Sequence, residues 1–145
     1  MNRSAHGTVT VSTNGPGFYD VTSDVSLWAR GRGDGLLTLM VQHTSASLLI
    51  QENADPEVQN DLIAYFERLV PDADHPSMAY LRHTYEGPDD MPAHIKAALM
   101  PVSLSIPVQD GALRLGTWQG IYLVEHRTRP HTRDIAAHFQ GDLPA

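Results

Sequence analysis

The sequence predicts an α+β protein that is mainly β: a single-domain antiparallel β-sandwich with a few short helices. Three observations support this class. Short segments with alternating or continuous apolar residues recur along the chain. Asp110-Gly111 separates two of them, as in a two-residue β-hairpin. Helix signals are few, the clearest being Asp55-Pro56. A chain of 145 residues is most simply one domain, which we assign to residues 1–145.

Seven segments have the composition or periodicity of β-strands. The first alternates strictly between polar and apolar residues, whereas the second and third are apolar-rich. Pro107 lacks a backbone N–H, so its strand is expected at a sheet edge or a bulge. The predicted strands are residues 8–12, 36–43, 45–51, 104–108, 112–115, 120–126 and 135–139.

Three helices are expected between the strands. The clearest covers residues 56–69, because Asp55 can cap its N-terminus and Pro56 suits the first helical position. A shorter helix is expected after Pro92, and a weaker one over residues 23–30. The apolar residues of the clearest helix fall on one stripe: Val58, Leu62, Phe66 and Leu69.

Composition excludes several kinds of site and partner. The chain has no cysteine, so disulfides and thiolate ligands are excluded, and any metal must be held by His, Asp or Glu. A formal net charge of −7 argues against bulk attraction to nucleic acid or to an anionic membrane. No stretch has the length of a signal peptide's apolar core or of a membrane span, so we predict a cytoplasmic protein. The local exception to the acidic character is a basic cluster of Arg127, Arg129, His131 and Arg133.

Two predicted strands each deliver a polar side chain at the end of an apolar face. His43 follows Leu37, Leu39 and Val41 on one face of its strand, and Glu52 ends a similar row. A lone histidine in this position is more often a hydrogen-bonded core residue than a ligand. Glu52 could equally begin the turn that caps the following helix.

The segment 83–96 is dense in residues that bind metals or transfer protons. His83 and His94 lie eleven positions apart, with Glu86 and Asp90 between them, which is not a standard zinc spacing. A solvated acidic loop whose aspartates cap the next helix would have the same residues. If His43 joined them, three imidazoles would leave a coordination position free, as in a catalytic zinc site. Glu86 or Asp90 would then transfer protons.

Other candidate binding residues lie in the second half of the chain. Trp118, between small residues, suits packing at a tight turn better than stacking on a ligand ring. Arg133 belongs to the basic cluster, which could clamp a phosphate or carboxylate but is usually a solvated loop in such a sequence. Lys96 could add to an anion site or face water.

Three segments together resemble the YjbQ-like family, whose members are often labelled secondary thiamine-phosphate synthases. These segments are HTSASLLIQENADPEV (43–58), HTYEGPDDMPAHIK (83–96) and GTWQGIYLVEHR (116–127). The resemblance implies a β-rich sandwich domain that assembles as a homotrimer. It also implies that His43, His83 and His94 gather around one pocket, which holds a divalent metal such as zinc in some members. The sequence TRPHTR after Arg127 differs from the glycine-rich version common in the family.

The family label implies condensation of a thiazole phosphate with a pyrimidine pyrophosphate, giving thiamine phosphate and pyrophosphate. On this hypothesis the partner is a small phosphorylated molecule, with no nucleic acid and no membrane. Two alternatives are a metal-dependent hydrolase of a small phosphorylated or carbonyl substrate, and a non-catalytic small-molecule or metal-binding protein. The expected roles are metal binding by His43, His83 and His94, catalysis by Glu52, Glu86 and Asp90, and substrate binding by Lys96, Trp118, Gln119 and Arg133.

Overall fold

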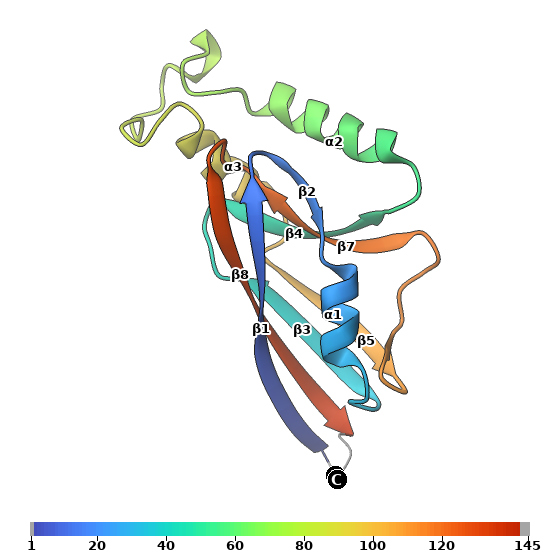
Figure 1. Ribbon diagram of the computed structural model, residues 1–145. Coiled ribbons are helices and arrows are strands. Elements are labelled where there is room, and N and C mark those ends of the chain that lie inside the picture. Colours follow the sequence, from blue (N-terminus) through green and yellow to red (C-terminus); the bar gives the residue numbers. More distant parts are fainter. Residues whose placement is uncertain (1, 143–145) are drawn as a thin grey trace.

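Two antiparallel sheets face each other in the computed structural model, which describes residues 2–142 (Figure 1). The larger sheet has the strand order β1-β8-β3-β5-β6, and the smaller has the order β2-β7-β4. The predicted α+β, mainly β class is therefore confirmed. The strands are β1 (Asn2–Asn14), β2 (Gly17–Asp20), β3 (Gly35–Val41), β4 (Ala46–Glu52), β5 (Ser103–Gln109), β6 (Ala112–Leu113), β7 (Gln119–Glu125) and β8 (Pro130–Asp142).

The inner faces of the two sheets form one hydrophobic core. Along β3, buried and exposed residues alternate, so that Leu37 and Leu39 point inward and Leu36 and Met40 point to solvent. Phe139 of β8 is fully buried beside them. The smaller sheet and its flanking helix contribute the facing core residues Val21, Val25, Ala46, Leu48, Ile121 and Leu123.

The strands agree with the sequence prediction in position more than in length. β1 and β8 each run for 13 residues, because they pair with each other from Asn2 and Asp142 to Asn14 and Pro130. The short strand β2 had no clear pattern and was not predicted. The hairpin at Asp110-Gly111 is confirmed: both residues have positive φ, and the flanking pairs are those of a two-residue turn.

Within the described part of the chain, four helical segments connect the strands: α1 (Thr22–Ala29), α2 (Pro56–Leu69), the 3-10 turn η1 (Pro76–Met78) and α3 (Asp90–Leu99). The cap of α2 is as predicted, since Asp55 Oδ1 accepts a hydrogen bond of 2.9 Å from the Glu57 backbone N–H. No residue of α2 is fully buried, and Leu69 is 52% exposed. α3 begins at Asp90, two residues before Pro92. No helix within residues 2–142 is both long enough and apolar enough to cross a bilayer.

His43 does not end the inward face of β3, as the sequence pattern had indicated. The strand stops at Val41, and His43 lies in the connection to β4. Its Nε2 accepts the backbone N–H of Asp134 at 2.9 Å. This bond follows the backbone bond from Gln42 to Asp134, so a side chain takes over where the strand pairing ends.

Candidate functional site

The turn before α3 and its first helical turn bring two histidines and two carboxylates together. His83 Nε2 lies 3.0 Å from Glu86 Oε2 and 3.0 Å from Asp90 Oδ2. His94, one turn after Asp90 on the same helix, places its Nε2 3.5 Å from Asp90 Oδ1. Asp90 is buried, whereas His83, Glu86 and His94 are partly exposed. The group is therefore an accessible cluster built on one buried carboxylate.

The geometry of His94 leaves one ring nitrogen available as a ligand. Its Nδ1 lies 3.1 Å from the carbonyl oxygen of Thr44, which can only accept, so Nδ1 carries the proton. Nε2 then presents a lone pair toward Asp90. A backbone carbonyl that fixes the ring in this way is typical of metal-binding histidines.

His83, Asp90 and His94 fit a divalent transition metal. One donor atom from each lies within 4.8 Å of the other two, which is the separation that a shared ion requires. Two imidazoles and one carboxylate suit zinc and neighbouring transition metals better than magnesium. The third member of this candidate set is Asp90, for which the sequence had indicated a role in proton transfer.

Arg127 holds the carboxylate side of the cluster in place. Its guanidinium contacts Asp89 Oδ2 at 2.9 Å, Asp90 Oδ1 at 2.8 Å and the carbonyl oxygen of Glu86 at 3.0 Å. Burial alone would raise the pKa of Asp89, but hydrogen bonds from the Thr128 backbone and Arg127 bring that pKa below its usual value. The sequence grouped Arg127 only with a basic cluster, because its partners lie about 40 positions earlier in the chain.

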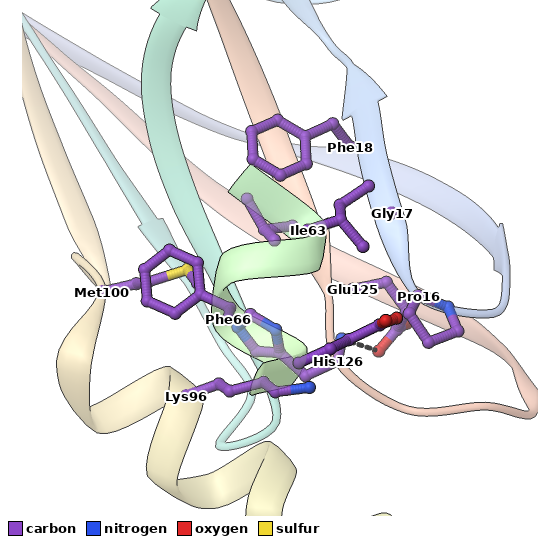
Figure 2. Close-up of a pocket in the computed structure, with 11 residues that line it drawn as sticks. Pro16, Gly17, Phe18, Ile63, Phe66, Lys96, Met100, Glu125 and His126 are labelled. Carbon is purple, nitrogen blue, oxygen red and sulfur yellow. Dashed lines mark hydrogen bonds between the residues drawn. The ribbon is translucent and has the colours of Figure 1, made fainter. Parts of the chain in front are cut away.

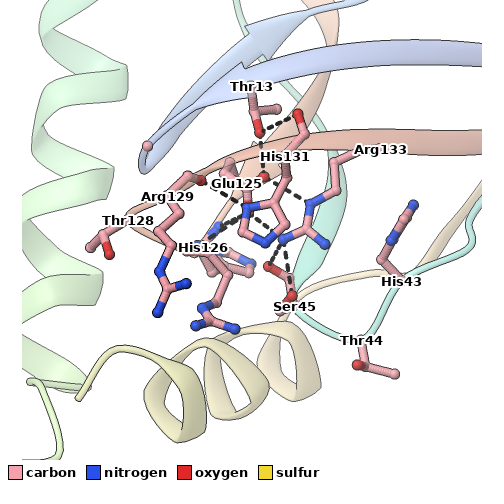
Figure 3. A network of polar contacts seen from close by, with 12 residues as sticks. Thr13, His43, Thr44, Ser45, Glu125, His126, Thr128, Arg129, His131 and Arg133 are labelled. Carbon is pink, nitrogen blue, oxygen red and sulfur yellow. Dashed lines mark hydrogen bonds and ion pairs between the residues drawn. The ribbon is translucent and has the colours of Figure 1, made fainter. Parts of the chain in front are cut away.

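A second polar network lies inside the fold (Figure 3). Arg133 donates from Nε to Glu125 Oε1 at 2.8 Å and from Nη2 to both Glu125 Oε2 and Ser45 Oγ. Thr13 Oγ1 donates to Glu125 Oε1. Arg133 is 3% exposed, so its charge is neutralised inside the protein and does not meet solvent. The phosphate contact expected for Arg133 is replaced by a structural ion pair.

His126 is a buried histidine that sequence reasoning missed. It is 5% exposed, and its Nε2 lies 2.9 Å from Ser47 Oγ. Burial, with a smaller contribution from the charge of Lys96, lowers its pKa to about 4, so the ring is neutral at pH 7. The available signal was its position directly after the apolar run of β7.

Acid should weaken the fold through His126. Between pH 6.5 and about 4, the unfolded chain binds a proton at His126, whereas the folded protein does not. At about 1.4 kcal/mol per pH unit, this costs about 3 kcal/mol of stability, absent above pH 6.5 and complete below about pH 4. Urea unfolding across this range should show a shallower decline for His126→Gln than for the parent. Parallel declines would contradict the assignment.

The structure separates the remaining predicted site residues from the cluster. His94 touches Thr44, just before β4, whereas Glu52, Trp118 and Gln119 lie at the far end of the β4–β7 pair. Seven residues of strand place these ends roughly 20 Å apart. Trp118 is 63% exposed, so it does not pack within its own chain as the sequence had favoured. Glu52 Oε2 is buried and has no hydrogen-bond partner within residues 2–142.

Two further predicted residues also lie outside the cluster. His43 is committed through Nε2 to Asp134, and the nearby Arg133 charge adds to burial in lowering its pKa. Lys96 follows His94 by two positions on α3, a rotation of about 200° around the helix, and so faces away from it. Lys96 lines a pocket with His126 instead. Of the predicted site residues, the structure therefore brings four together within one chain: His83, Glu86, Asp90 and His94.

Comparison with known proteins gives consistent matches over most of the chain. A family model described as UPF0047 protein YjbQ-like matches residues 7–142. The UPF0047 protein sll1880 of Synechocystis sp. is 46% identical over 135 residues, covering 92% of this chain and 89% of that protein. The UPF0047 protein YjbQ of Escherichia coli O157:H7 is 45% identical over 138 residues, covering 93% of this chain and 96% of that protein.

Solved structures of similar chains share the fold. The conserved hypothetical protein TT1486 from Thermus thermophilus has a TM-score of 0.78 and 34% sequence identity, covering 90% of this chain and 97% of that chain. The hypothetical protein APE1520 from Aeropyrum pernix has a TM-score of 0.81 and 30% identity, covering 94% of this chain and 98% of that chain. The strand arrangement described above is therefore shared over nearly the whole length of these proteins.

Proposed function

The chain belongs to the UPF0047 protein YjbQ-like family, and we propose that it is a metal-dependent enzyme acting on a small phosphorylated substrate. His83, Asp90 and His94 are the proposed ligands of a divalent ion, with zinc favoured by the donor set. The reaction implied by the family resemblance is transfer of a pyrimidine from its pyrophosphate to a thiazole phosphate. We place this activity in the cytoplasm.

The observation that carries the proposal is the orientation of His94. Its Nδ1–H is donated to the Thr44 carbonyl, so its Nε2 lone pair faces the same space as Asp90 and His83. A solvated acidic loop would not need a ring held in this way by a distant backbone group. Three protein ligands leave coordination positions open, which favours a catalytic over a purely structural ion.

The chain's own residues divide the remaining work. A bound divalent ion would supply positive charge where negative charge develops on a phosphate oxygen. Arg127 fixes the Asp90 carboxylate, so this ligand needs little rearrangement. Glu86 is more exposed than Asp90, and its contact with His83 Nε2 would be replaced by the ion when His83 binds it. The freed carboxylate is suited to carry a proton between substrate and solvent. Asp90 thus changes from the proton-transfer role expected from sequence to the role of ligand.

A homotrimer is part of this proposal. Glu52, Trp118 and Gln119 can reach the substrate at the His83–Asp90–His94 cluster only from a neighbouring copy, because they lie roughly 20 Å from it in their own chain. The unpartnered oxygen of Glu52 and the exposed ring of Trp118 are consistent with a surface completed by another subunit. Sedimentation velocity tests this part, and a monomer at micromolar concentration would contradict it.

Metal content should depend on both histidines of the cluster. We expect close to one zinc or similar ion per chain in protein purified without an affinity tag, and its loss in His83→Ala and His94→Ala, measured by elemental analysis. His75→Ala is the matched control, because His75 is exposed and, within residues 2–142, its side chain bonds only to Ser77. Metal-free parent protein, even after incubation with divalent ions, would leave these histidines as acid/base or ligand-binding groups.

Activity assays then separate the possible reactions. Metal-loaded parent protein given thiazole phosphate and the pyrimidine pyrophosphate should form thiamine phosphate, detected by chromatography. Release of phosphate from other small phosphate esters, without thiamine phosphate, would indicate the hydrolase alternative. Binding without turnover would indicate the non-catalytic alternative.

A further inference from the structure

A second pocket lies between α2, β2 and β7, with Lys96 of α3 at one end (Figure 2). It is open to solvent, and the space of about 300 Å³ between and above its walls includes part of that solvent. One wall is apolar and is formed by side chains from β2, α2 and β7 and by Met100, which directly follows α3. The opposite end is polar, and Lys96 extends along it next to His126. The apolar wall consists of Phe18, Ile63, Phe66, Met100 and Val124.

Lys96 is the only lysine in the chain, whereas nine arginines carry the other positive side-chain charges. Within residues 2–142, no ion pair or hydrogen bond is formed by its ammonium group. The buried carboxylates near it are already paired, Glu125 with Arg133 and Asp89 with Arg127. Glu67, also on the pocket wall, is exposed to solvent. The pocket therefore holds one positive charge that lacks an anion.

His126 adds a polar surface to this end of the pocket without adding charge. Its Nε2 is occupied by Ser47, and the ring is neutral at pH 7. A neutral imidazole beside an ammonium group allows one anionic head to bind without a second cation. The pocket is therefore matched to one anionic group, with Lys96 as its counter-ion.

The apolar wall accounts for the incomplete burial of the apolar stripe of α2. This helix has a clear apolar stripe, yet none of its residues is fully buried. Ile63 and Phe66 face the pocket, where they are only partly covered. An apolar group of a ligand would contact these side chains and remove more of their surface from water, which favours binding.

We propose that this pocket binds a small organic anion that carries an aromatic or branched apolar group, at a site separate from the His83–Asp90–His94 cluster. Lys96 binds the anionic head, and Phe66 with its neighbours binds the apolar group. The head is a carboxylate or a phosphate ester, and the two are distinguished by experiment. The proposal does not depend on the proposed metal chemistry.

The single lysine allows a direct test. Reductive methylation with ¹³C-formaldehyde keeps the positive charge and labels only Lys96 and the terminal amine. Titration with phenyl phosphate or benzoate should shift the Lys96 resonance in a saturable way, with a dissociation constant at or below about 1 mM. Inorganic phosphate lacks the apolar group, and benzyl alcohol lacks the anionic group. Each should therefore bind at least about 10-fold more weakly, a loss of roughly 1.4 kcal/mol.

Calorimetry on unlabelled protein supplies the variant controls. Lys96→Met and Phe66→Ala should each weaken binding of the better probe at least about 10-fold, whereas Lys96→Arg should retain most of it. Arg114→Met, which removes an exposed cation elsewhere, should have no effect. Unchanged binding in Lys96→Met would overturn the proposal, as would inorganic phosphate binding as tightly as phenyl phosphate. Metal content should stay unchanged in Lys96→Met, so this result is distinct from failure of the metal site.

Discussion

Replacing Glu125 with glutamine is expected to destabilise the protein by about 3–5 kcal/mol, because it leaves Arg133 as an uncompensated charge in the core. Both side chains are almost fully buried. Glu125 Oε2 also accepts the backbone N–H groups of His126 and Arg127 at 3.0 and 3.1 Å. If the glutamine NH₂ group takes the place of Oε2, its N–H groups face three other donors. If it takes the place of Oε1, they face the donors of Thr13 and Arg133.

Chemical denaturation at pH 7 measures this change. Glu67→Gln, on the exposed face of α2, is the matched control and should alter stability by no more than about 0.5 kcal/mol. The double replacement Glu125→Gln with Arg133→Met removes both charges and should recover part of the loss. If Glu125→Gln cost no more than the control, the buried pair would not stabilise the fold. Burial would raise the pKa of Glu125, but Arg133 and Thr13 hold it below its usual value, so the stabilisation is lost as pH falls through that lowered pKa.

Replacing Asp90 with asparagine is expected to reduce metal affinity by at least about 100-fold, since loss of a group that merely orients a metal ligand already costs about 10–100-fold. The change removes the proposed anionic ligand while keeping the shape of the side chain. It also puts an amide beside His83 or Arg127, both of which contact the carboxylate at 3.0 Å or less. Competition with a chromophoric chelator measures the affinity.

Asp89→Asn is the control for this prediction. Asp89 is the adjacent carboxylate and also binds Arg127, but its other contacts are to Thr128 rather than to the histidines. A loss of about 10-fold, acting through Arg127, is expected there. Equal losses in the two variants would mean that Asp90 supports the loop and does not bind the ion. Loss of thiamine phosphate formation in Asp90→Asn alone would connect the ion to the proposed reaction.

The parts of the site that were predictable from sequence are those held by short-range structure. His83, Asp90 and His94 lie within twelve positions, and a turn followed by a helix is enough to bring them together. His43 was misplaced because its position depends on the Asp134 backbone, 91 residues away. Arg127 and Arg133 share one basic segment, yet one reaches the acidic turn and the other the core. That difference follows from strand pairing, which the local pattern does not contain.

The fold shows the same division between local and distant information. Asp55 and Pro56 specify the start of α2 by themselves, and Asp110-Gly111 specifies its hairpin. β1 and β8 are longer than predicted because backbone pairing continues through polar positions. His6 and His138, for example, lie opposite each other and are exposed to solvent. Apolar periodicity indicates which residues face the core. It does not indicate how far the backbone pairing of two strands extends beyond the core.

The pairing of β1 with β8 also sets the order in which the chain can fold. All other strands and helices that the structure describes lie between these two in sequence, yet β8 joins β1 to β3 in the larger sheet. Contacts between such distant segments require closure of a long loop and are characteristic of slow folding. During synthesis, β1 emerges from the ribosome well before its partner, with its backbone hydrogen-bonding groups unpaired. Protection of this nascent edge from association with other chains therefore matters until β8 is complete.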